Sequence, residues 1–215
     1  TSEPRVTRQD RGPVTWLTLN RPEAMNALDP NLLSELDAHV RSVSDDPTVR
    51  VVVITATGRA FCAGADLKAI LGEKGVLDAA RMLGFERQAQ ATFARVAALA
   101  KPTIAALNGI TMAGGLELAL HCDLVIASSR ARIGDGHTNY GLLPGAGGAA
   151  RLPRVVGPTR AKYLAFTGEL LSAEQAMAMG LVVEVVAPDE LESRADELSS
   201  AIGRRSPSAL RLFKQ

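Results

Sequence analysis

Residues 103–120 read TIAALNGITMAGGLELAL, and this stretch decides the fold class. Thr103 to Leu107 is a short apolar run, which is typical of a buried strand. Asn108-Gly109 is a turn sequence, and an apolar helix is predicted to open near Gly114-Gly115. A buried strand followed closely by an apolar helix indicates a layered α/β protein.

The same alternation continues on both sides of this stretch. Apolar or alternating runs predict strands at residues 14–19, 49–55, 124–127 and 182–186. Helices are predicted from the Asp29-Pro30 cap pair, over residues 78–100, from the Ser172/Gln175 capping box to Gly180, and over residues 191–202. Strands that are nearly all apolar and are followed by helices predict an α/β fold, but this pattern alone does not say which one.

The composition indicates one globular domain without a nucleic-acid or membrane partner. The 24 Lys and Arg residues balance 23 Asp and Glu residues, so a net charge of +1 gives no electrostatic reason to bind nucleic acid or an acidic membrane. No run reaches the ~18 apolar residues of a membrane span, and the charged first residues show no secretory signal. Cys62 and Cys122 alone do not make a disulfide framework. We therefore expect a cytoplasmic protein.

Two segments rich in glycine and alanine could expose backbone N–H groups. The first, FCAGADL at residues 61–67, would let a ligand approach the backbone, although on its own it is more typical of a tight strand-to-helix connection in which Asp66 is a cap. In the second, Gly114-Gly115 leaves unpaired N–H groups at the positive end of a helix dipole. Glu117 lies on the same face one turn later. Such amides can stabilise an oxyanion beside a carboxylate, or Glu117 can simply complement the dipole.

A third segment, GDGHTNYGLLPGAGG at residues 134–148, contains a histidine among glycines. Its Gly145-x-Gly147-x-x-Ala150 spacing matches a relaxed dinucleotide fingerprint, but Pro144 stands where a parallel strand should end, so nucleotide binding is not predicted. His137 can titrate near neutral pH, and the sequence is equally compatible with a hydrogen-bonded loop histidine. The His121-Cys122-Asp123 run has the wrong spacing for metal ligands, so no metal site is predicted.

Several spaced motifs occur in one order along the whole chain. They are LNRP (19–22), FCAGADLK (61–68), KP (101–102), NG (108–109), AGGLELA (113–119), CD (122–123), PGAGG (144–148), LV (181–182) and VV (185–186). Together they resemble the enoyl-CoA hydratase/isomerase (crotonase) superfamily. Several motifs in register are far more specific than any one of them alone.

The resemblance implies an enzyme that adds water to the double bond of a 2-trans-enoyl-CoA in fatty acid metabolism. The fold would be an α/β, crotonase-like spiral of ββα units that assembles into a homotrimer or hexamer and binds the acyl-CoA in a bent pose. The N–H groups of Ala63 and Gly114 would form an oxyanion hole, and Glu117 would activate the water. The CoA and acyl parts of the substrate would contact eight residues, which are Ala24, Ala63, Gly64, Ala65, Asp66, Leu67, Lys68 and Gly115. No cofactor besides the CoA of the substrate is expected.

The chain departs from the hydratase pattern at the second acid/base residue. The hydratases carry a glutamate seven positions before the proline of the Pro-Gly-x-Gly motif, and this chain has His137 there. An imidazole can do acid–base work at neutral pH, so hydration by Glu117, with or without His137, is expected. His137 leaves double-bond isomerisation or carbon–carbon hydrolysis open. A β-diketone hydrolase branch of the family also carries histidine at this position, with an aspartate inside the glycine motif, and Ala146 at that place in this chain weakens this alternative. A third possibility is a homologue that binds acyl-CoA without turnover, against which Glu117 argues.

The resemblance also predicts how the chain is divided. Residues 1–203 would form the spiral core domain, and residues 204–215 would begin a carboxy-terminal helical region that is cut short relative to the family. We also expect apolar residues between Lys68 and Phe93 to shape the acyl pocket.

Overall fold

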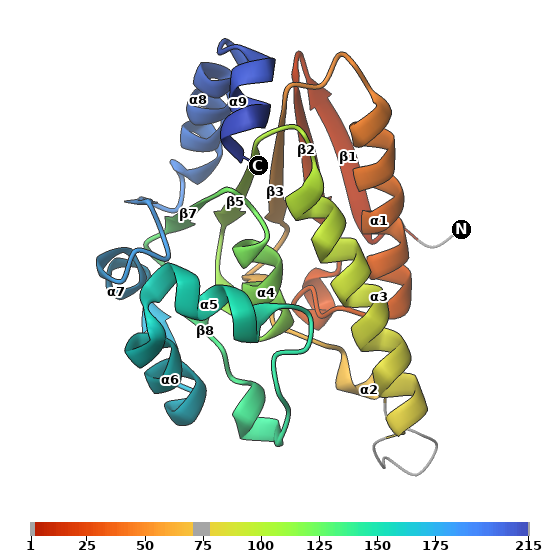
Figure 1. Cartoon of the computed structure of the whole chain (residues 1–215), viewed down its shortest axis with the longest axis vertical. Coiled ribbons are helices and arrows are strands. Elements are labelled where there is room, and N and C mark those ends of the chain that lie inside the picture. The colour runs from red at the N-terminus through yellow and green to blue at the C-terminus, as the bar shows by residue number, and fades with distance from the viewer. Residues whose placement is uncertain (1–2, 71–77, 215) are drawn as a thin grey trace.

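Two sheets organise the computed structural model, which describes residues 3–70 and 78–214 (Figure 1). In this described part, the larger sheet has the order β1 (Val6–Arg11), β2 (Val14–Leu19), β3 (Val51–Ala56), β5 (Thr103–Leu107), β7 (Leu124–Ser128) and β10 (Glu184–Val186). The smaller sheet has the order β4 (Ala60–Cys62), β6 (Ile110–Met112), β8 (Arg132–Gly134) and β9 (Leu171–Ser172). All pairings are parallel except β1 with β2 and β8 with β9.

Successive turns of the chain repeat one unit, so the predicted spiral of ββα units is confirmed. Strands β3, β5 and β7 lie in the larger sheet, and β4, β6 and β8 follow them in the smaller sheet. A helical segment comes next in each turn: α2 (Leu67–Ile70) and α3 (Ala79–Ala98), then α4 (Gly114–Leu120), then η2 (His137–Tyr140) and α5 (Gly148–Val156). Because neighbouring strands are parallel, the segments after β4, β6 and β8 leave the smaller sheet at the same edge.

Helices cover both faces of the larger sheet. Side chains alternate along each strand, so Leu17 and Leu19 join the core under α1 (Pro30–Asp45) and α3, while Trp16 packs with α8 (Leu191–Gly203) on the opposite face. The remaining helices are η1 (Pro22–Ala24), α6 (Pro158–Thr167), α7 (Ala173–Ala178) and α9 (Pro207–Lys214). In Figure 1, α5, α6 and α7 gather on one side of the molecule, and α5 lies against α4. Among the described helices, none combines the length and apolar character that crossing a membrane requires.

Local signals placed the long elements well. The strand bounds 14–19 and 103–107 agree with the structure, the Asp29 side chain caps α1 through the Leu32 N–H at 2.8 Å, and both hydrogen bonds of the Ser172/Gln175 capping box are present. The strand prediction over 182–186 was too long, because β10 begins only at Glu184.

The elements that the sequence analysis did not predict are charged, short or glycine-rich. Strand β1 is an edge strand with half-exposed side chains, so it tolerates charged residues that hide its pattern. Each strand of the smaller sheet has two or three residues, which is too few for a periodicity. Helices α5 and α6 were also missed, since Gly148 opens the first and Gly157 separates the two.

Candidate active site

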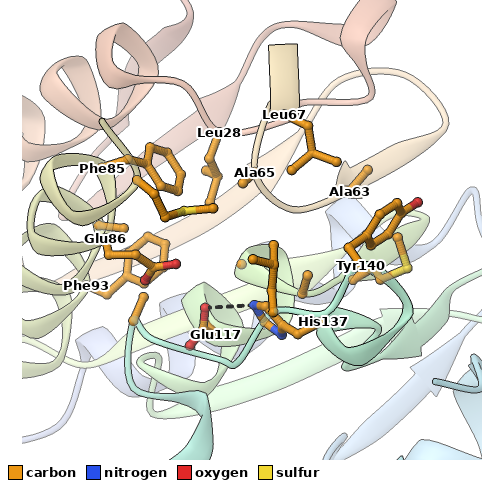
Figure 2. Close-up of a pocket in the computed structure, with 17 residues that line it drawn as sticks. Leu28, Ala63, Ala65, Leu67, Phe85, Glu86, Phe93, Glu117, His137 and Tyr140 are labelled. Carbon is orange, nitrogen blue, oxygen red and sulfur yellow. Dashed lines mark ion pairs between the residues drawn. The ribbon is translucent and has the colours of Figure 1, made fainter. Parts of the chain in front are cut away.

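A cavity lies where the segments after β4, β6 and β8 face α3 (Figure 2). Helix α3 supplies an apolar wall that includes Met82, Phe85, Ala89 and Phe93. These residues fall within the 68–93 segment that was expected to shape an acyl pocket; residues 71–77 of that segment lie outside the described residues. The opposite wall carries Glu117 and His137, which face this mostly apolar wall across the cavity.

Glu117 and His137 meet inside this cavity. The Nε2 atom of His137 lies 3.5 Å from Oε2 of Glu117. Both residues are buried: His137 is 7% exposed to solvent and Glu117 is 3% exposed. Figure 2 shows the two groups pointing toward one another from α4 and η2. The structure thus joins the two predicted acid/base residues, which are 20 positions apart in the sequence (137 minus 117).

Backbone contacts hold the Glu117 carboxylate in place. All seven residues of α4 are buried, so the helix delivers Glu117 into the interior. The second carboxylate oxygen, Oε1, accepts a hydrogen bond from the Gly148 N–H at 2.8 Å. This N–H belongs to the first residue of α5, where backbone donors lack intrahelical acceptors. The sequence analysis did not predict this contact, because it depends on how α5 packs against α4.

Asp135 forms the other contact of His137, and the sequence analysis missed it. Its Oδ1 accepts a hydrogen bond from Nδ1 of His137 at 2.6 Å, and the aspartate is 2% exposed. Burial by itself lowers the pKa of His137, but the hydrogen bonds and charges of Asp135 and Glu117 outweigh burial and raise this pKa to about 9. His137 is therefore an imidazolium at neutral pH.

A second unpredicted carboxyl group faces the same cavity from α3. Glu86 is half-buried, and burial raises its pKa; the charge of Glu117 adds to this effect, whereas the charge of His137 opposes it. The helical pattern of α3 gave no sign of Glu86, because one polar position beside Phe85 is common on an amphipathic helix. Glu86 can be identified as part of the site only from the structure, where it lies among the apolar residues of the cavity wall.

The backbone N–H groups of Ala65 and Gly114, which both line the cavity, have no hydrogen-bond acceptor among residues 3–70 and 78–214. Leu28 exchanges hydrogen bonds with the Gly64 carbonyl and the Asp66 N–H, both at 2.8 Å, so the Ala65 N–H between them points away from Leu28. The ideal position of a Cβ atom on Gly114 lies 3.9 Å from the Ala65 nitrogen, which places the two amides close together.

The expectation that Ala63 donates an oxyanion-hole amide is wrong in this structure. Its N–H already donates to the Met25 carbonyl oxygen at 3.1 Å. The chain then turns at Gly64 with a φ of +99°, and a Cβ there would lie 2.9 Å from the Ala113 side chain. Only glycine suits this conformation, and the turn brings Ala65 rather than Ala63 into the donor position.

The turn before α4 is also held in an unusual conformation. Ala113 has a φ of +50° and a ψ of −119°, a region that residues with a side chain seldom adopt. Such a conformation costs on the order of 1–3 kcal/mol and is typical of functional sites. The Ala113 N–H donates to the Gly134 carbonyl at 3.2 Å, which ties this turn to the start of the Asp135–His137 segment.

The residues expected to contact CoA lie in three different settings. Ala63, Ala65 and Leu67 line the cavity, while Ala24 ends η1 and Lys68 is exposed at the start of α2. Asp66 forms an ion pair with Arg21 at 3.1 Å. Gly64 and Gly115 are buried and are not part of the cavity lining; a Cβ atom on Gly115 would collide with the Cys62 backbone.

No group of three His, Cys, Asp or Glu side chains in the described ranges is arranged to hold a metal ion. His121, which precedes Cys122 in the sequence, instead has its Nδ1 atom 2.7 Å from the Glu117 carbonyl oxygen. The chemistry that this cavity offers is therefore that of two carboxyl groups, an imidazolium and unpaired backbone amides that include those of Ala65 and Gly114.

Comparisons with known proteins agree with this geometry. Residues 9–215 match the family model described as enoyl-CoA hydratase/isomerase. The chain is 43% identical to the 2,3-dehydroadipyl-CoA hydratase of Escherichia coli over 214 residues, covering 100% of this chain and 81% of that protein. It is 41% identical to the crotonyl-CoA hydratase of Syntrophomonas wolfei, covering 92% and 75%. A crystal structure of an enoyl-CoA hydratase from Bacillus anthracis superposes with a TM-score of 0.93 at 38% identity, covering 98% of this chain and 81% of that one.

Proposed function

The chain belongs to the enoyl-CoA hydratase/isomerase family, and we propose that it adds water across the double bond of a 2-trans-enoyl-CoA. The observation that carries this proposal is the Glu117–His137 pair, which faces two unpaired amides across one cavity. Relatives named as hydratases of crotonyl-CoA and 2,3-dehydroadipyl-CoA support the reaction type.

The mechanism assigns one proton transfer to each side chain. The Glu117 carboxylate takes a proton from water while the water oxygen bonds to the β-carbon. The electron pair of the double bond moves toward the thioester, whose oxygen gains negative charge. The Nε2–H of His137 then gives its proton to the α-carbon, which yields the 3-hydroxyacyl thioester. Glu117 is left protonated and His137 neutral, and return of the proton across their 3.5 Å separation restores the starting pair.

The N–H groups of Ala65 and Gly114 would stabilise the developing charge on the thioester oxygen. Two preorganised donors in a cavity shielded from water act mainly on the transition state, and removing one such donor typically costs about 3–4 kcal/mol. The Ala65 assignment replaces Ala63 and follows from the hydrogen bond between Ala63 and Met25.

The CoA part would leave the cavity past η1 and α2. Ala24, Asp66, Leu67 and Lys68 are the expected contacts; Asp66 is already paired with Arg21, whereas Lys68 is an exposed cation suited to a phosphate. No cofactor besides the CoA of the substrate enters the proposed reaction. A homotrimeric or hexameric assembly and a cytoplasmic location stay predictions; exposed apolar side chains such as Phe166 (79%) and Leu143 (78%) favour an assembly.

The test is hydration of crotonyl-CoA and longer 2-enoyl-CoA esters, followed by the loss of enoyl-thioester absorbance. Glu117→Gln removes the base but keeps an oxygen that can accept from the Gly148 N–H, so we expect kcat to fall by about 10²–10⁴ with the fold intact. Glu174→Gln, on the exposed face of α7, is the matched control. Full activity of the Glu117→Gln protein would refute the assignment.

His137 in place of a glutamate keeps two other reactions of the family open, and product analysis in ¹⁸O-water separates them. Hydration places the label on the β-carbon, and isomerisation places none in the product. Carbon–carbon hydrolysis of a β-diketone releases a labelled acid.

A further inference from the structure

Asp135 is a buried carboxyl group whose side-chain hydrogen bond and ion pair, within the described residues, are both with His137. It follows β8 directly, its Oδ1 atom lies 2.6 Å from Nδ1 of His137, and its Oδ2 atom is buried without a hydrogen-bond partner in the described ranges. No described Lys or Arg forms an ion pair with it. A buried carboxylate is costly unless a cation or several hydrogen bonds compensate for it. The protonated imidazole is thus the group that balances its charge.

We propose that Asp135 is a positioning residue that keeps His137 as an imidazolium, with Nδ1–H donated to Asp135 and Nε2–H directed at the substrate α-carbon. This inference rests on the proposed hydration. The aspartate accepts from Nδ1–H, so a ring that also carries a proton on Nε2 is doubly protonated, and the nearby carboxylate stabilises this imidazolium. Without the carboxylate, the ring would lose its second proton at a lower pH, and the neutral ring that keeps Nδ1–H has no proton on Nε2.

The groups that face His137 come from several elements. Glu117 approaches from α4 at 3.5 Å, Glu86 acts at longer range from α3, and Tyr140 lines the same cavity from η2. Helix α6, on the other side of η2, carries Arg160 and Lys162, and both are exposed.

Asp135 is nearer to the ring than the other two carboxyl groups. Burial lowers the pKa of His137, and the hydrogen bond to Asp135 is the largest of the effects that raise it to about 9. Asp135→Asn should therefore lower the pKa of His137 while keeping an oxygen that can accept from Nδ1. Asp135→Glu keeps the negative charge on a longer side chain, so the pKa of His137 should lie between those of the Asp135→Asn protein and the parent.

The first experiment measures the parent protein and uses one variant only to assign signals. In ¹⁵N-histidine-labelled protein, a His137→Gln protein identifies the signals of His137 among the three histidines. We expect both ring nitrogens of His137 to carry protons at pH 7.5 and the ring to titrate near pH 9. A singly protonated ring at pH 7.5 would overturn the proposal.

The second experiment compares the Asp135→Asn and Asp135→Glu proteins with the parent across pH. For Asp135→Asn, we expect the ring titration and the alkaline limb of kcat to move together to lower pH, so that kcat falls at least about tenfold near pH 8 and much less near pH 6. Asp135→Glu should show a smaller shift. An unchanged titration and pH profile in Asp135→Asn would contradict the inference. If the titration shifts but the parent hydrates no enoyl-CoA, the proposed function fails and the positioning of His137 stands.

Discussion

Adding one methyl group at Gly148 should displace the proposed catalytic base without removing its hydrogen-bond donor. A Cβ atom built there lies 3.0 Å from both Cγ and Oε1 of Glu117, and 2.9 Å from Cβ of Pro144. Carbon atoms pack favourably at about 3.5–4.0 Å. The Pro144 ring has little freedom to move, so Glu117 must shift by roughly 0.5–1 Å. The N–H that donates to Glu117 is retained in Gly148→Ala.

A displacement of this size is large enough to lower the reaction rate measurably. Misplacing a reacting group by 1 Å can lower a rate by about 10²-fold, so we expect kcat of Gly148→Ala to fall about 10- to 100-fold, with a small change in KM. Hydration of crotonyl-CoA is the assay. Gly84→Ala is the matched control, because a Cβ on Gly84 meets no atom within 4 Å and alanine favours the helix.

Thermal unfolding of both proteins shows whether a low kcat of Gly148→Ala comes from a displaced Glu117 in a folded protein or from loss of the fold. A folded Gly148→Ala protein with the parental kcat would refute the reasoning, because it would mean that the position of Glu117 does not control the rate.

Two further perturbations test the amides and the imidazolium. Gly114→Ala would place a methyl group 2.7 Å from the flexible end of Leu28 and 3.9 Å from the Ala65 nitrogen; crowding the space between the amides should lower kcat/KM at least about tenfold at an unchanged Tm, and an unchanged kcat/KM would count against the oxyanion hole. Because the pKa of His137 is raised from 6.5 in the unfolded chain to about 9 in the folded protein, protonation of this ring stabilises the folded state. This stabilisation is complete below pH 6.5 and is lost as the pH rises through about 9. Urea unfolding across that window should show the parent losing roughly 3 kcal/mol relative to His137→Gln, and parallel curves would contradict this.

The sequence predicted correctly which residues lie together when they share one helix. It did not predict the arrangement of residues around a turn. Glu117 and Gly114 share a helix, so a fixed spacing places the carboxyl group beside the amide. Ala63 and Ala65 flank a glycine whose φ is +99°, and the orientation of each amide follows from that angle rather than from residue type. The motif therefore indicated the loop that carries the proposed donor, but assigned the role to Ala63 rather than Ala65.

Asp135 was missed for the same reason. Residues two positions apart point to opposite sides in a helix and to one side in a strand, so the spacing of Asp135 and His137 alone predicts no contact. Gly136 adopts a φ of +67° between them, and this left-handed turn accompanies the 2.6 Å contact between the two side chains.

The pairing of Asp135 with His137 also explains why this site does not need a second glutamate. A carboxyl group at position 137 can donate a proton only while it is protonated, whereas an imidazolium between two carboxylates is an acid at neutral pH. A glutamate placed at 137 alone would put a third carboxyl group beside Asp135 and Glu117 in a buried space, with Glu86 nearby, and would leave Asp135 without its cation. Like charges in such a space force one group to take up a proton. We therefore expect that position 137 cannot be exchanged independently of position 135, because the proposed acid consists of both residues.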